Sequence, residues 1–200
     1  MNTTFYRLLI CQIVTLFANA ALRFALPLYL LRKTGSAALY GGITAAALVP
    51  MLAGTLYGGI LADSCRKQTL LAVLNFITAL GLLAAAICFR QIPSTAVVLG
   101  TLCLLYAAEG LFQPAVQACL PLLLLGPALT QGNAAIQLAD TIDELLGPLL
   151  GSLLLQSVGL RTLLIFCAVC LAATALFFQT LPIPQPTRQP PAVPGQRLEK

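Results

Sequence analysis

Ten residues indicate the fold of this chain: Gly58-Gly59-Ile60-Leu61-Ala62-Asp63-Ser64-Cys65-Arg66-Lys67. They join two long apolar runs, residues 37–62 and 68–89. Each run is long enough for the ~20 apolar residues of a transmembrane helix. Most turns between membrane spans are a few polar residues without a pattern. This turn has paired glycines, then an acid, then two bases, and it is therefore the most specific feature of the sequence.

Composition indicates that the chain is embedded in a membrane. Of its 200 residues, 59% are hydrophobic and only 8% are charged. A soluble domain carries about 25% charged residues. Six apolar runs are long enough to cross a bilayer: residues 8–31, 37–62, 68–89, 95–121, 133–157 and 161–181. We therefore predict an all-α membrane protein with a six-helix bundle over residues 1–181 and no soluble domain.

The last segment, residues 182–200, differs from the rest of the chain. Prolines occupy positions 182, 184, 186, 190, 191 and 194. Proline fixes its own φ angle and has no amide hydrogen, so a helix cannot form through such a segment. We predict an extended or disordered linker on the cytoplasmic side.

The distribution of basic residues predicts the orientation. Loops on the cytoplasmic side of a membrane carry an excess of Lys and Arg. With the N-terminus inside, the cytoplasmic side holds Arg7, Arg66, Lys67, Arg188, Arg197 and Lys200, and the outer side holds Arg32, Lys33, Arg90 and Arg161. An even number of spans places both termini on one side. We therefore predict that both termini of this multi-pass protein are cytoplasmic.

The composition also argues against several kinds of chemistry. The net charge of +5 is scattered over short loops, so no nucleic-acid-binding surface is expected. The sequence has no histidine, and Cys167-x-x-Cys170 has no second pair of ligands. We therefore expect neither a histidine proton relay nor a metal site. Without a nucleophile–base set or a phosphate-binding loop, we predict no enzyme activity and no cofactor.

Five charged residues lie inside the predicted spans: Arg23, Glu109, Asp140, Asp143 and Glu144. A charge in the hydrocarbon region costs on the order of 2.5–3.5 kcal/mol, so each of them needs an explanation. At ~1.5 Å per residue, Arg23 lies about 22 Å above the inner end of its helix, and Glu144 about 16 Å above the start of its own. We predict an ion pair of Arg23 with Glu144 or Asp143 inside the membrane.

Two further acids have similar predicted depths, Glu109 at about 9–15 Å and Asp140 at about 10 Å. If their helices face each other, one of the two would keep its proton near neutral pH, because like charges in a low dielectric cannot both ionise. Proton-coupled transport requires such a group. Two simpler interpretations stay open: Arg23 could extend to the outer interface, and Glu109 could be interfacial.

The turn at residues 58–67 resembles a loop motif of the major facilitator superfamily, which lies there between the second and third helices. The matching positions are Gly59, Leu61, Ala62, Asp63, Arg66 and Lys67. The basic pair follows the acid one residue earlier than is usual, and Ser64 replaces a usual base. The resemblance implies that the glycine, the acid and the two bases form an inner gate that engages the partner half of the protein.

A second resemblance lies in the fifth apolar run. Gly147-Pro148-x-x-Gly151-Ser152 is similar to the antiporter motif of the same superfamily, with Asp143 where a small residue is common. Residues 22–29, 34–36 and 112–118 are similar to the drug-exporter branch that includes macrolide-efflux and enterobactin-exporter-like proteins. The resemblance implies that Gly147, Pro148 and Gly151 shape the fifth helix of a proton-driven exporter.

The resemblance covers about residues 5–185 and corresponds to one six-helix half of a twelve-helix transporter. It implies export of drug-like, macrolide or siderophore-like molecules by proton antiport at a bacterial inner membrane. The five charged residues within the spans would be coupling or cavity groups. Besides lipid, substrate and protons, a second six-helix bundle is then an expected partner, supplied by another chain or a second copy. The alternative is a truncated, non-transporting membrane protein or an interaction module.

Overall fold

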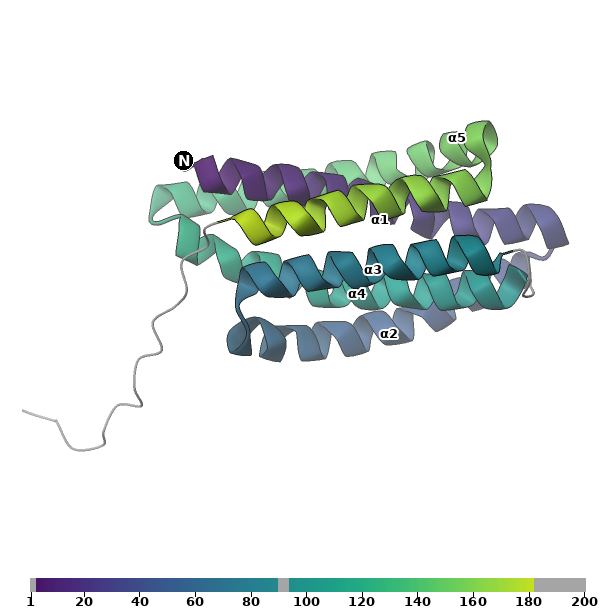
Figure 1. The fold of residues 1–200 in the computed structure, drawn as a ribbon, viewed down its shortest axis with the longest axis horizontal. Helices are drawn as coiled ribbons and strands as arrows, with labels where there is room; N and C mark the ends of the chain where they lie inside the picture. The colour runs from purple at the N-terminus through teal and green to yellow at the C-terminus, as the bar shows by residue number, and fades with distance from the viewer. Residues whose placement is uncertain (1–2, 90–93, 182–200) are drawn as a thin grey trace, which may run out of the picture.

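The computed structural model describes residues 3–89 and 94–181, and this part of the chain is helical throughout, without strands (Figure 1). Its helices are α1 (Thr3–Thr34), α2 (Ala37–Ser64), α3 (Lys67–Cys88), α4 (Ser94–Leu123) and α5 (Pro127–Thr180). Each helix is long and apolar enough to cross a membrane. The predicted tail, residues 182–200, lies outside the described residues. The all-helical architecture of a multi-pass membrane protein is therefore as expected.

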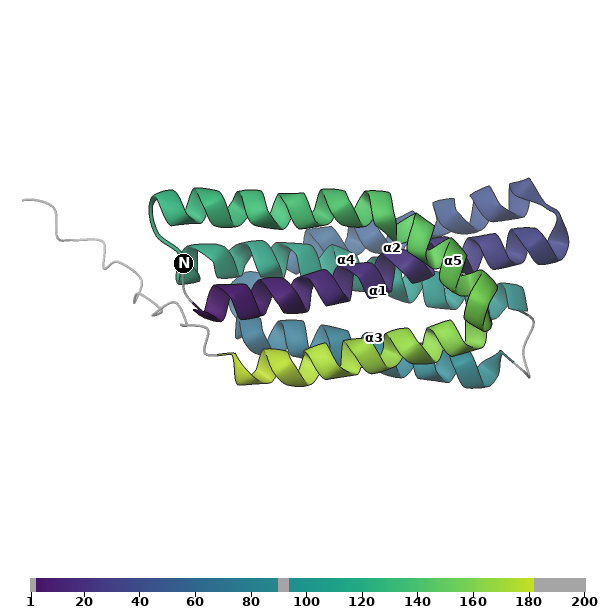
Figure 2. The same ribbon diagram turned by 90° about the horizontal axis from the view of Figure 1, so that it is seen from above.

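The fifth element folds back on itself. α5 has 54 residues, and its helical dihedral angles are interrupted at Gly159, where φ is 77° and ψ is 162°. Side chains rarely allow a positive φ, so glycine is the residue that permits this reversal. Figure 2 shows the two arms of α5 running in opposite directions from the turn. The predicted runs 133–157 and 161–181 lie one in each arm, and the residues between them contain the turn at Gly159.

Two other predicted loops are also shorter than expected. The segment between the predicted runs 95–121 and 133–157 is mostly helical, because α4 continues to Leu123 and α5 already begins at Pro127. Proline is favoured at the first helical position, where its missing amide hydrogen is not needed. The polar turn at residues 63–67 is likewise mostly helical, since α2 ends at Ser64 and α3 begins at Lys67. Polar residues at helix ends had been interpreted as loop.

Two prolines lie inside α4 and do not interrupt it. Pro114 and Pro121 each remove a backbone hydrogen bond, yet the helix continues through both of them to Leu123. Packing of the surrounding buried residues outweighs the lost backbone hydrogen bonds, and neighbouring helices can satisfy the freed carbonyls in a membrane protein. The helix ends before Gly126, whose φ of 57° turns the chain into α5.

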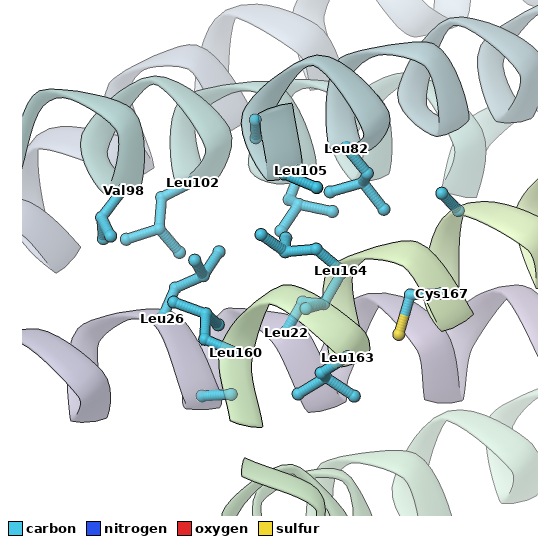
Figure 3. Close-up of a cluster of buried hydrophobic side chains, with 14 of the residues drawn as sticks. Leu22, Leu26, Leu82, Val98, Leu102, Leu105, Leu160, Leu163, Leu164 and Cys167 are labelled. Atoms are coloured by element: carbon cyan, nitrogen blue, oxygen red, sulfur yellow. The ribbon is translucent and has the colours of Figure 1, made fainter. Parts of the chain in front are cut away.

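The hydrophobic core consists of two separate clusters along the length of the bundle. One cluster is built around Leu22, Leu82, Leu102 and Leu163, which converge from α1, α3, α4 and the second arm of α5 (Figure 3). The other surrounds Phe5, Leu71, Phe112, Ile136 and Phe178 near the opposite end of the same helices. On α1, α3, α4 and the second arm of α5, a short segment separates the two sets of residues.

Candidate functional site

Polar side chains gather near the middle of the bundle, around the boundary between the two apolar clusters. We call this set the polar layer: Gln12, Thr15, Asn19 and Arg23 on α1, Asn75 on α3, Glu109 and Gln113 on α4, and Asp140, Asp143 and Thr174 on α5. Most of these residues lie near the middle of their helix or of their arm of α5. Charged residues within membrane-spanning helices are costly and usually functional.

The charged part of the polar layer is built around Arg23. Its Nη1 atom donates to Oε2 of Glu109, and its Nη2 atom lies 3.8 Å from Oδ2 of Asp143. The three side chains are 17%, 14% and 3% exposed. The guanidinium carbon also lies 5.5 Å from the ring centre of Tyr106. Arg23 thus connects α4 to the first arm of α5 in the interior of the bundle. We call Arg23, Glu109 and Asp143 the ion triad.

The ion triad partly matches the predicted pairing. Asp143 was one of the two expected partners of Arg23, whereas the other, Glu144, is exposed and takes no part in the ion pairs of the described residues. Asp143 shares the buried face of α5 with Ala139 and Gly147, four residues away on either side. The next residue, Glu144, is rotated by about 100° around the helix axis and leaves that face. Glu109 was not predicted as a partner of Arg23.

Asp140 has a different partner from the one expected. The sequence suggested that it faces Glu109, but its Oδ1 atom accepts a hydrogen bond of 3.4 Å from Nε2 of Gln113. Gln113 lies one helical turn beyond Glu109 on α4. Asp140, which binds Gln113, therefore lies about one turn away from Glu109 along the bundle. The side chain of Gln12 also lies close to the Asp140 carboxyl group. The predicted sharing of one proton between Glu109 and Asp140 is therefore not supported by this geometry.

Several buried atoms of the polar layer have no hydrogen-bond partner in the described part of the chain. They are Nε2 and Oε1 of Gln12, Oδ1 of Asn19, Nε of Arg23, Oε1 of Gln113 and Oδ1 of Asp143. A buried polar group left without a partner costs about 1–3 kcal/mol, so such atoms are rare unless they serve a function. The polar layer therefore has unused capacity to donate and accept hydrogen bonds.

The comparison with protein families identifies the class of protein. Residues 8–198 match the family model described as Major Facilitator Superfamily. This chain belongs to the Major Facilitator Superfamily. It is therefore a membrane-embedded, multi-pass protein of a transporter family. No curated protein matches the chain.

The gate motif that pointed to the Major Facilitator Superfamily is divided between two helices. Lys67 is buried, and its Nζ atom donates to the carbonyl oxygen of Ala62 at 3.0 Å. A cation at this position stabilises the carbonyl end of α2. Arg66 is exposed at the start of α3, Gly59 faces open space, and Asp63 belongs to the last turn of α2. The Asp63 side chain lies outside the part of the chain that the structure describes.

The segment that resembles the superfamily's antiporter motif lies where α5 contacts α1. A Cβ atom on Gly147 would lie 2.5 Å from Cβ of Ala20, and one on Gly151 would meet the carbonyl oxygen of Ala21. Pro148 lies between the two glycines and is half-buried. These small residues let two helix backbones approach closely. The contact holds α5 against α1 one turn beyond Asp143, and it therefore sets the distance between Asp143 and Arg23.

Sequence reasoning missed the uncharged part of the polar layer. Nδ2 of Asn75 donates to Oγ1 of Thr15 at 2.9 Å and to Oγ1 of Thr174 at 3.0 Å. This buried cluster joins α1, α3 and the second arm of α5. Amide residues in the middle of apolar runs, such as Asn75 and Gln12, were the available signal, because they have no reason to face lipid.

Replacing Asn75 by leucine is expected to lower the free energy of unfolding by about 0.6–1.7 kcal/mol, the range measured for hydrogen bonds between membrane helices. Chemical unfolding in detergent micelles would measure the change. Asn133→Leu is the matched control, because Asn133 is exposed on α5. An equal effect of the two substitutions would show that the three-helix hydrogen bonds contribute no stability.

Proposed function

We propose that this chain is one six-helix half of an exporter of small molecules, driven by proton antiport. Drug-like, macrolide or siderophore-like compounds are the proposed substrates. The observation that carries the proposal is the ion triad, in which one cation is shared by two carboxylates at the middle of the bundle. Its formal charge is −1, and a dry interior favours neutrality, so the triad has reason to take up one positive charge.

Asp143 is the group best placed to take up that charge. Its Oδ2 atom faces Arg23, whereas its buried Oδ1 atom has no partner and can accept a proton. A proton on Oδ1 would remove the attraction of Asp143 for Arg23 and leave Arg23 bound to Glu109. The contact between α5 and α4 would then weaken. A cationic substrate could neutralise the triad in place of the proton, and this competition is the logic of antiport.

The exposed face of the first arm of α5 supports the need for a second bundle. Asn133, Gln137, Thr141 and Glu144 are all exposed and are spaced by four, four and three residues, so they form one stripe along the helix. A polar stripe that includes the charge of Glu144 is unfavourable against lipid hydrocarbon. We propose that a second six-helix bundle, from another chain or a second copy, faces this stripe across a hydrated cavity. Alternating access would then be motion between the two bundles.

The gate motif completes the proposal at the cytoplasmic end. With both termini cytoplasmic in a bacterial inner membrane, Asp63, Arg66 and Lys67 lie at the inner surface. The charges of Asp63 and Arg66 would contact the second bundle in one of the two conformations of the transporter, while Lys67 holds the end of α2. Gly59 leaves open space at the surface of α2, where such a bundle can approach.

Transport by reconstituted protein tests the proposal. The full chain would be incorporated into liposomes at a high protein-to-lipid ratio, so that two copies can meet, and ethidium efflux followed under an imposed proton gradient. We expect gradient-dependent flux that an ionophore abolishes and that Asp143→Asn removes. Gln156→Leu, an exposed change on the same helix, is the control and should retain flux.

Two outcomes would overturn this function. If the wild-type chain shows no gradient-dependent flux, the alternative of a non-transporting membrane protein is favoured. If flux occurs and Asp143→Asn leaves it unchanged, Asp143 is not the coupling group.

A further inference from the structure

One edge of the polar layer brings together three side chains that the ion triad does not use. They are Gln12 on α1, Gln113 on α4 and Asp140 on the first arm of α5. Gln113 donates to Oδ1 of Asp140 at 3.4 Å, and Gln12 lies close to the same carboxyl group. Gln12 is fully buried, at 0% exposure, while Gln113 and Asp140 are partly exposed. The group thus has a closed end at α1 and an accessible end.

The unpartnered atoms of this group are mainly acceptors. Oε1 of Gln12 and Oε1 of Gln113 are buried and have no hydrogen-bond partner in the described part of the chain. Together with the Asp140 carboxylate they supply oxygen acceptors from three helices. An ammonium group carries three N–H donors and one positive charge, and it matches these acceptors in both respects. The bonds would be charge-assisted, which are the stronger class of hydrogen bond.

The surrounding charges favour the same ligand. Across the polar layer Glu109, Asp140 and Asp143 carry three negative charges, and Arg23 carries one positive charge. An anionic ligand would therefore be repelled. Arg23 is already engaged with Glu109 and Asp143, so it cannot neutralise Asp140 at the same time. A bound cation would complete the charge balance at the level of Asp140.

We propose that Gln12, Gln113 and Asp140 bind the protonated amine of a small organic substrate, a role that rests on the proposed export function. The amine donates to the two amide oxygens and to the carboxylate. The rest of the substrate extends toward the partly exposed side of Gln113 and Asp140.

Equilibrium binding to the full chain in lipid nanodiscs tests this site without any gradient. The probes are benzylamine, benzyltrimethylammonium, benzyl alcohol and benzoate, measured by calorimetry against empty nanodiscs. They share one ring and differ in charge and in N–H donors. We expect benzylamine to bind at least about tenfold more tightly than each of the other three, because only it offers both a charge and three donors.

Variants separate this role from a structural one. Gln12→Leu is expected to reduce benzylamine affinity about tenfold while leaving thermal stability unchanged or raised, because it replaces a buried unpartnered amide by an apolar side chain. Asp140→Asn is nearly the same size and is expected to abolish the preference for benzylamine over benzyl alcohol. Gln156→Leu, exposed far along the same arm, should change neither affinity nor stability.

Three results would contradict the proposed amine site. Equal binding of benzyltrimethylammonium, displacement of benzylamine by millimolar sodium, or unchanged affinity in both Gln12→Leu and Asp140→Asn would each overturn the amine site. Because binding is measured without transport, a chain that binds amines but moves no dye contradicts only the export function. A chain that exports dye without preferring amines contradicts only the amine site.

Discussion

Arg23→Met is expected to lower the free energy of unfolding by about 3–5 kcal/mol, the usual cost of removing one partner from a buried ion pair. The substitution leaves Glu109 and Asp143 without their cation in the interior, where their side chains are only 14% and 3% exposed. Removing only the cation is expected to lower the free energy of unfolding more than neutralising all three residues of the ion triad. We therefore expect the neutral variant Arg23→Met/Glu109→Gln/Asp143→Asn to regain most of the lost stability, because no uncompensated charge remains.

The chain contains its own reporters for this measurement. Cys11, Cys119 and Cys167 are buried free thiols, so a thiol-reactive fluorescent dye would follow unfolding as they become accessible. Cys65 is exposed and would be replaced by serine to lower the background. Arg32→Met is the control, because Arg32 is an exposed base on the same helix. If both arginine variants unfold alike, Arg23 behaves as a side chain at the interface and the ion triad does not stabilise the bundle.

Much of the helical architecture could be predicted because each helix is decided by local composition. A run of ~20 apolar residues has few alternatives in a membrane, since every backbone group must find a partner within the segment. The predicted boundaries of α2 and α3 therefore lie within two residues of those observed. The loops between the helices were harder to predict from the sequence. The predicted runs left residues 122–132 outside the spans, yet Pro127 begins a helix that buries Gly132 against Leu124 and Phe5.

The partners within the polar layer could not be predicted, because they depend on the rotation of each helix about its axis. Depth along a helix follows from residue number, and on that basis Arg23 and Asp143 were placed at compatible levels. Rotation decides that Asp143 and not Glu144 faces inward, and that Glu109 meets Arg23. It is set by the contact of Gly147 and Gly151 with α1, which involves residues more than a hundred positions apart.

A second large loss of stability is expected at Gly110 in α4, where two helix backbones are also in close contact. A Cβ atom on Gly110 would meet the carbonyl oxygen of Met51, and it would lie 3.0 Å from N of Thr55 and 3.2 Å from C of Gly54. All three are backbone atoms of α2 and cannot rotate away. Gly110→Ala is therefore expected to force α2 and α4 apart and to lower the free energy of unfolding by about 1–3 kcal/mol, the usual cost of overpacking.

Gly100 supplies the matched control on the same helix, because a Cβ atom there would meet nothing within 4 Å. Gly100→Ala should raise stability by about 0.5–1 kcal/mol, since alanine has the higher helix propensity. The two variants carry the same chemical change, so opposite signs in the thiol-dye assay would isolate the steric term. Glu109 directly precedes Gly110, so a shift of α4 should also disturb the ion triad. Equal effects of the two variants would mean that α2 and α4 are not held by close backbone contact.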